Sequence, residues 1–299
     1  IEEFSNIKKE VREQLQKDFS LELPKVIKRE IDTDVEKYLF ELSDNERIEA
    51  VLMRHNYGLS VCVSSQVGCN MGCKFCESGR LKKVRNLEAH EMVGQILVIE
   101  SLIKERISSV VIMGIGEPLD NYENVIRFIK IINDAKGIQI GARHITLSTC
   151  GLIPKIKELS ELDIQINLAI SLHAPNDNLR NEIMPINKAY PLQELMETIK
   201  EYIKKTNRRV TMEYILLKGV NDQKKHAKEL ANLLRGMNVY VNLIPYNETN
   251  HIEFQKSDKE TIDAFYRELQ KEKIQVTVRR EFGSSISAAC GQLRSKEIK

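Results

Sequence analysis

The stretch CVSSQVGCNMGCKFC, residues 62–76, holds four of the six cysteines in this chain of 299 residues. Cys69, Cys73 and Cys76 follow the strand-like run LSVCVSS (59–65) and are separated by three and two residues. This spacing lets three thiolates converge on one metal centre from a single loop. An ordinary 4Fe-4S cluster uses four cysteines, so three leave one position for an outside ligand. The pattern therefore favours a 4Fe-4S cluster with an open position, where chemistry takes place.

A zinc knuckle is the alternative that the same cysteines leave open. A structural zinc site needs four ligands, and Cys62 or a distant histidine would have to supply the fourth. That protein would be a zinc-stapled RNA-binding module without catalysis. Metal content separates the two interpretations, because the zinc form would be colourless.

Outside the cysteine loop, short apolar runs alternate with segments of helical period, as in a parallel sheet built of βα units. The expected strands are 59–65, 108–114, 143–149, 164–172, 209–217, 239–246 and 274–280. We therefore expect an α/β fold, a partial (β/α)6-type barrel with its functional groups at the carboxyl ends of the strands. This core spans residues 57–299, including a C-terminal segment that contains Cys290. Residues 1–56 form an N-terminal accessory segment, helical at first and then strand-like at 36–42 and 47–55.

Composition narrows the class of protein further. Hydrophobic residues make up 42% of the chain and charged residues 29%, and no apolar run approaches the roughly 18 residues of a membrane span. We expect a globular protein without a membrane segment or secretory signal, in the cytoplasm, where clustered cysteines are more often ligands or catalytic groups than disulfides. The net charge of +2 leaves nucleic-acid binding undecided.

The segment CNMGCKFC (69–76) resembles the radical S-adenosylmethionine (SAM) enzymes, with an aromatic residue before the last cysteine. Five more segments, together with the residues around this one, resemble the RNA adenosine-carbon methyltransferases of the RlmN/Cfr family, most of all its dual-specificity RlmN branch. The matching segments are 51–69, 110–121, 141–156, 169–187, 241–247 and 288–297. Because the six segments occur in the same order over about 250 residues, the probability of a chance similarity is very small.

The resemblance implies an activity and its cofactors. A 4Fe-4S cluster on Cys69, Cys73 and Cys76 would bind SAM through its free iron and split it to a 5′-deoxyadenosyl radical. The reaction would methylate carbon 2 of adenosine in 23S ribosomal RNA, at the peptidyl transferase centre, and in transfer RNA, next to the anticodon. We expect an electron donor such as flavodoxin or ferredoxin, and a monomer.

The resemblance also assigns catalytic roles to three residues. Cys290 would take a methyl group from one SAM, and the radical from a second SAM would remove hydrogen from that methyl. The carbon radical would add to adenine, Glu49 would accept a proton, and Cys62 would release the product by closing a transient disulfide with Cys290. The residue pattern alone makes Glu49 an ordinary charged residue on an edge strand.

SAM contacts come partly from pattern and partly from resemblance. The run GIGE (114–117) ends an expected strand, where glycine lets backbone approach a ligand and a carboxylate can accept from an ammonium group. The family assigns SAM contacts to Gly116, Glu117, Ser148, Ser171, Leu172, His173 and Asn247. Cys150 has no such role, and we interpret it as structural.

Basic clusters are the candidate contacts for RNA phosphates. They are GRLKKVR (79–85), KKTNRR (204–209), and Arg279 with Arg280. A target base would have to leave its stack to reach a buried radical.

The chain departs from its relatives at several points, and these leave alternatives open. Ser285 and Ser287 stand where relatives usually carry aspartates, which is compatible with a paralogue of changed substrate. Glu77 stands where RlmN proteins commonly have a small residue. A Cfr-type enzyme, which methylates carbon 8 and confers ribosomal antibiotic resistance, is the near alternative. The amino-terminal part is shorter than in the family, as in a fragment or a minimal form.

Overall fold

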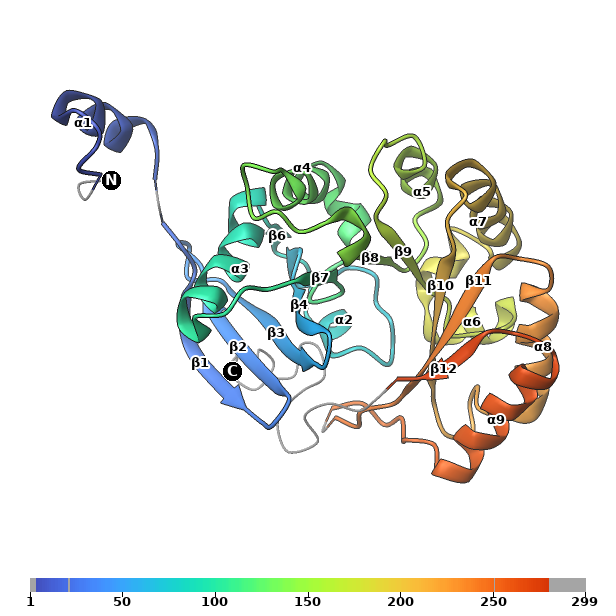
Figure 1. Ribbon diagram of the computed structural model, residues 1–299. Coiled ribbons are helices and arrows are strands. Elements are labelled where there is room, and N and C mark those ends of the chain that lie inside the picture. Colours follow the sequence, from blue (N-terminus) through green and yellow to red (C-terminus); the bar gives the residue numbers. More distant parts are fainter. Residues whose placement is uncertain (1–3, 21, 250, 280–299) are drawn as a thin grey trace.

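The computed structural model describes residues 4–20, 22–249 and 251–279. Within them ten strands form one sheet in the order β1-β2-β3-β4-β7-β8-β9-β10-β11-β12 (Figure 1). Every neighbouring pair from β4 to β12 is parallel, whereas β1 to β4 are antiparallel. The strands are β1 Lys25–Ile31, β2 Val35–Glu41, β3 Arg47–His55, β4 Gly58–Val63, β7 Ser109–Ile112, β8 Ile145–Thr149, β9 Asn167–Ser171, β10 Val210–Leu216, β11 Val239–Pro245 and β12 Val276–Val278. A separate two-stranded sheet pairs β5 (Gln66–Val67) with β6 (Arg85–Asn86).

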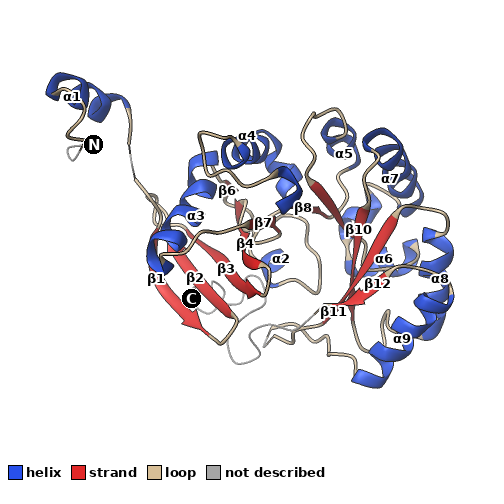
Figure 2. Cartoon of the chain, in the orientation of Figure 1, coloured by secondary structure: helices blue, strands red, loops and turns tan. Residues whose placement is uncertain are grey.

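Helices cover the outer side of the curved sheet, and α1 stands apart from it (Figure 2). The helices of the described residues are α1 Lys9–Asp18, α2 Glu77–Arg80, α3 Ala89–Ile103, α4 Tyr122–Asn133, α5 Ile153–Leu159, α6 Asp177–Ile183, α7 Leu192–Thr206, α8 Lys224–Leu234 and α9 Lys259–Lys271. Short 3-10 turns are η1 Pro118–Asn121, η2 Ala142–His144 and η3 Pro185–Lys188. Helix α3 buries Met92, Ile96 and Ile99, which lie three or four residues apart on one face. These contacts join the main hydrophobic core between helices and sheet. None of the helices that the structure describes has the length and apolar character of a membrane span.

The expected α/β partial barrel is confirmed, and all seven expected strands of its core are present. The accessory segment contains β2 and β3 as expected, but β1 was not anticipated. Its sequence KVIKREI mixes charges with apolar residues, and no side chain in it is fully buried, so periodicity gave little signal.

The edge-strand expectation for Glu49 is wrong. Strand β3 lies between β2 and β4, and its pairing with β4 continues the sheet across the expected boundary near residue 56. Two further strands therefore cover the edge where Glu49 was expected to meet solvent. The division into an accessory segment and a core stays a prediction.

Strand register carries one set of side chains along the inner face of the barrel. Val51 on β3 lies opposite Cys62, and Cys62 lies opposite Val111 on β7. Further along, Ser171 lies opposite Glu213 on β10, which pairs with Asn242 on β11. Because side chains alternate between faces, this register brings polar groups from distant parts of the sequence to the same concave surface.

Candidate functional site

A cavity of about 320 Å³ opens on this concave surface, toward the carboxyl ends of the parallel strands. Ten of the residues that the sequence singled out line it. They are Cys62, Cys69, Cys73, Cys76, Gly116, Glu117, Ser148, Ser171, His173 and Asn247. As the barrel rule predicts, these residues share one cavity, and their functional roles stay a prediction.

The cysteine loop is held by its backbone. Cys69 N–H donates to Leu81 O at 2.9 Å, and Lys74 N–H donates to Ile183 O at 2.9 Å, which ties the loop to α6. Gly79 of α2 packs so closely that an added Cβ would lie 2.9 Å from Cys73 O. Burial raises the pKa of Cys69 to about 12, so this thiol is protonated in the metal-free chain. Metal binding would release its proton.

The three cysteines fit a cluster better than a single ion. No group of three His, Cys, Asp or Glu side chains among the described residues could hold one metal ion. Zinc requires all its ligands around one centre, whereas a 4Fe-4S cluster spreads its cysteines over different irons. Cys69, Cys73 and Cys76 line the same cavity, so the residues present fit a cluster that leaves one iron open.

Glu117 is a buried carboxylate fixed by main-chain donors. Leu119 N–H donates to its Oε1 at 3.0 Å and Cys150 N–H to its Oε2 at 2.8 Å. Burial raises the pKa of Glu117, while these hydrogen bonds act in the opposite direction. Cys150 is buried and contributes through its backbone, which agrees with a structural role.

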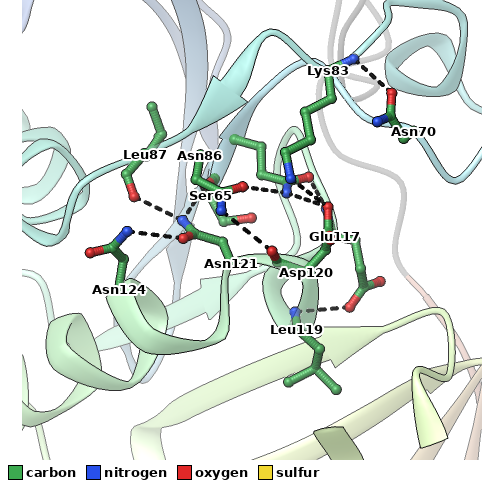
Figure 3. Close-up of polar contacts among 11 residues, drawn as sticks. Ser65, Asn70, Lys83, Asn86, Leu87, Glu117, Leu119, Asp120, Asn121 and Asn124 are labelled. Atoms are coloured by element: carbon green, nitrogen blue, oxygen red, sulfur yellow. Dashed lines mark hydrogen bonds and ion pairs between the residues drawn. The ribbon is translucent and has the colours of Figure 1, made fainter. Parts of the chain in front are cut away.

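A polar network supports the loop that carries Glu117 (Figure 3). Asp120 Oδ2 accepts from Gln66 Nε2 at 2.9 Å and from Lys83 Nζ at 2.7 Å. Asn121 Nδ2 donates to the carbonyls of Ser65 and Leu87, both at 2.8 Å. The network joins the β4 end, the segment after the cysteine loop and η1, so these parts are positioned together.

His173 has a left-handed backbone, with φ of 57°, at the end of β9. Its Nδ1 accepts from Ile215 N–H at 3.0 Å, so in the neutral ring the proton is on Nε2. Burial lowers the pKa of His173 to about 3, with a smaller contribution from the Arg180 charge. This imidazole is therefore a neutral hydrogen-bond donor on the cavity wall.

Arg180 is a positioning residue that the sequence reasoning missed. Its guanidinium is fully buried and donates to the carbonyls of Cys150 at 2.7 Å and Leu172 at 3.2 Å. It thereby ties the ends of β8 and β9 together. The sequence signal was an arginine inside the otherwise ordinary helix DNLRNEI, which is not distinctive.

Leu172 is placed differently from the other expected SAM contacts. Its side chain is in the hydrophobic core and does not line the cavity. Its N–H donates to Glu213 O at 3.0 Å and its carbonyl accepts from Arg180. The expected contact of Leu172 with SAM stays a prediction.

Glu49 and Cys62 lie on adjacent strands and on the same face of the sheet. Glu49 Oε2 is 3.0 Å from Lys37 Nζ, and both side chains are buried. Cys62 is buried on the cavity wall, and no disulfide joins two cysteines within the described residues. Cys290, its expected partner, and the serines at 285 and 287 lie outside the described residues.

Glu213 is a further acidic group on the cavity wall that the sequence did not reveal. It accepts from Asn242 Nδ2 at 2.9 Å, and burial raises its pKa. Within VTMEYIL it occupies an inward position of a strand that is otherwise largely apolar. The sequence signal for Glu213 was an acidic residue within the largely apolar strand VTMEYIL.

The three basic clusters differ in their position relative to the cavity. In GRLKKVR, Lys83 pairs with Asp120 and Arg85 with Glu91, so both cations serve internal ion pairs. The cluster KKTNRR precedes β10 and lies at the amino ends of the strands, opposite the cavity. Arg279 lines the cavity itself, and Arg280 lies outside the described residues. Arg279 is therefore the best placed for a contact beside the site.

The fold and the three-cysteine cavity define a radical SAM enzyme, and the sequence profile of the Radical SAM superfamily matches residues 63–231. This class uses a 4Fe-4S cluster and SAM, so both are cofactors of this protein. A crystal structure of a radical SAM methyltransferase from Sphaerobacter thermophilus superposes with a TM-score of 0.91 at 42% identity. The match covers 96% of this chain and 85% of that one.

Close relatives narrow the assignment. A probable dual-specificity RNA methyltransferase RlmN from Spiroplasma citri is 54% identical over 299 residues, covering 99% of this chain and 86% of that protein. A protein with the same description from Enterococcus faecalis is also 54% identical, with coverage of 99% and 86%. The chain belongs to the RlmN family of dual-specificity RNA methyltransferases.

Proposed function

We propose that this enzyme methylates carbon 2 of adenosine in 23S ribosomal RNA and in transfer RNA, using two SAM molecules and a methylcysteine intermediate. The observation that carries the proposal is one cavity lined by the three cluster cysteines, Cys62 and the expected SAM contacts other than Leu172. Similarity to RlmN relatives over nearly the whole chain supports the same substrate class.

Carbon 2 of adenine is electron-poor, so it does not attack a sulfonium methyl as a nitrogen or oxygen would. When bound, the cluster and SAM supply the 5′-deoxyadenosyl radical that a carbon-centred reaction of this kind requires. Cys69, Cys73 and Cys76 would hold the cluster. Glu117 lies on the same wall, where its carboxylate can accept from the ammonium group of SAM.

Three residues of the chain would carry the methyl transfer. Cys290 would receive the methyl group from the first SAM. Glu49 would accept the proton released as the adduct with adenine collapses. Once the radical adduct has given up one electron to the oxidised cluster, Cys62 would attack the Cys290 sulfur and close a transient disulfide. The electron pair of the broken sulfur–carbon bond would stay on the carbon, which takes up a proton to complete the methyl group. Two placements support this division of roles. Cys62 lies on the cavity wall, and Glu49 is two residues from Val51, the residue that pairs with Cys62 across the strands.

The RNA would deliver a flipped-out adenine to the cavity. Arg279 has its guanidinium on the cavity wall, where its Nη1 lies 3.8 Å from the Sδ atom of Met113. A cation at this position would hold a phosphate near the extruded base.

The test is anaerobic turnover of the iron-reconstituted enzyme with methyl-deuterated SAM, using a 23S RNA fragment and a transfer RNA. Nucleoside mass spectrometry against authentic standards then identifies the product. Deuterated 2-methyladenosine from both RNAs is the expected result. The 8-methyl isomer would replace the proposal with the Cfr-type reaction. Formation of 5′-deoxyadenosine without any methylated nucleoside would keep the class of enzyme and reject the substrate.

A further inference from the structure

A second hollow lies directly behind the cysteine loop. It is lined by Gly72, Cys73, Lys74, Gly79, Arg80, Lys218, Val220 and residues 251–255, and we name it the outer groove. Among the described residues, Cys73 is the one that lines both the outer groove and the central cavity. The residue shared by the cofactor site and this surface is therefore one that is expected to ligate the cluster.

The outer groove carries an excess of positive charge. Lys74 and Lys218 are exposed on its rim and form no ion pair with any residue in the described part of the chain. Arg80 lies 3.6 Å from the buried Glu77. Glu253 is the one acidic lining residue. The surface thus presents two exposed lysines on separate segments, and neither forms an ion pair within the described residues.

The floor of the groove is apolar. Val220, Ile252 and Phe254 are half-buried and pack against the smaller core that also contacts Cys73 and Phe75. Lys218 N–H donates to Gln255 O at 2.9 Å, which fixes one wall to the other. An apolar floor with a charged rim is the anatomy of a protein interface. A track for RNA phosphates would need no such floor and no proximity to the cluster.

We propose that the outer groove docks a small acidic one-electron donor protein of the flavodoxin class. The rim lysines would attract its acidic surface, and the apolar floor would seat the edge around its flavin. One electron would leave the fully reduced flavin, which is oxidised by one electron, and would reduce the cluster through the Cys73 wall. The inference rests on the cofactor assignment and is independent of which RNA carbon is methylated.

The experiment measures the rate at which reduced flavodoxin reduces the cluster in the reconstituted full-length protein, by anaerobic stopped-flow absorbance without RNA. The test variant is Lys74→Glu with Lys218→Glu. The matched control, Lys130→Glu with Lys200→Glu, makes the same change in net charge on exposed positions of α4 and α7. Dithionite, a small reductant that needs no docking surface, reports on the cluster itself.

We expect the second-order rate constant with flavodoxin to fall at least about tenfold in the test variant at low ionic strength. The control should keep the wild-type rate, and dithionite should reduce all three proteins equally. Added salt should slow the wild type and leave the test variant nearly unchanged. An undiminished flavodoxin rate in the test variant overturns the proposal, whether or not its affinity for RNA falls.

Lys74 is next to a cluster ligand, so its substitution is the one that could disturb the loop. If dithionite reduction also slows in the double variant, the test is repeated with Lys218→Glu alone, because Lys218 lies outside the cysteine loop. A reduced flavodoxin rate with normal dithionite reduction supports docking, and an unchanged flavodoxin rate overturns it. Failure to methylate RNA despite normal reduction by flavodoxin would count against the proposed function alone.

Discussion

Lys37 and Glu49 form an ion pair whose side chains are 0% and 3% exposed. Removing two charges from water is costly, and their attraction offsets that cost only while both partners remain. The pair lies on strands β2 and β3, on the face that also carries Cys62. Its role in holding the Glu49 carboxylate in place can be separated from its effect on stability.

Lys37→Met and Glu49→Leu should each lower the free energy of unfolding by about 3–5 kcal/mol, because each strands a buried charge. The double variant should be more stable than either single variant. Urea denaturation of the cluster-loaded proteins under anaerobic conditions measures this, with Lys200→Met on the exposed face of α7 as control. Strictly additive losses would contradict a coupled pair.

His173 should stay neutral from pH 5 to 8. Its folded pKa of about 3 lies below the unfolded value of 6.5, so the unfolded chain binds the proton more tightly. The stability contributed by this residue is therefore present above pH 6.5 and is lost as pH falls toward 3. The imidazole NMR resonances of His173 should show no titration between pH 5 and 8.

His173→Asn is the matched variant, because asparagine tolerates the left-handed backbone and its side-chain oxygen can replace Nδ1 as acceptor. Between pH 6.5 and 4 its stability should fall less steeply than that of the wild type. Identical slopes in denaturation series across this range would show that His173 is not the group responsible.

At the scale of elements, the turn from β7 into η1 shapes the SAM wall. Gly116 adopts φ of 108°, and an added Cβ would lie 2.6 Å from the Gln66 Cβ. Gln66 Oε1 accepts from Glu117 N–H at 2.9 Å, so the same contact positions the buried carboxylate. A side chain at 116 would disturb both the turn and its neighbour.

Gly116→Ala should destabilise the protein by more than the roughly 1–3 kcal/mol of backbone strain alone, since it also displaces Gln66. SAM affinity should fall at least about tenfold, the equivalent of 1.4 kcal/mol. Gly236→Ala is the control, because Gly236 has φ of 77° and nothing within 4 Å of an added Cβ. Calorimetric titration with SAM measures the difference, and equal affinities of the two variants would refute the steric argument.

At the scale of the whole molecule, the site depends on a single continuous sheet. Strand β4 brings Cys62 to the cavity wall, and the carboxyl ends of β7, β8, β9 and β11 bring expected SAM contacts to the same cavity. The cluster and SAM would be held by residues from several of these segments. Cofactor binding should therefore stabilise the fold as a unit.

SAM at 100 times its Kd should stabilise the cluster-loaded protein by about 2.7 kcal/mol. The cluster-free protein should gain much less, because the open iron is missing. Cys76→Ala, which removes one ligand, should behave like the cluster-free form. Anaerobic thermal denaturation checks this, and equal stabilisation of loaded and cluster-free protein would show that SAM binds without the cluster.

The barrel could be predicted because parallel strands buried on both faces produce continuous apolar runs, such as VTMEYIL in β10. Strand β1 escaped prediction because partly exposed positions lack that pattern. The cysteine loop and the GIGE turn were local signals, each within a few residues. Their convergence on one cavity followed from the rule that carboxyl ends of parallel strands share an edge.

The sequence by itself indicated the class of chemistry, since the spacing of the three cysteines favours a cluster and the six matching segments resemble one family. It did not distinguish Glu49 from a solvated glutamate, nor Arg180 and Glu213 from ordinary helix and strand residues. Only the tertiary structure buried these charges, fixed their partners and put the outer groove behind Cys73. The physical reason is that burial and pairing depend on residues far apart in the chain, which the folded sheet brings together.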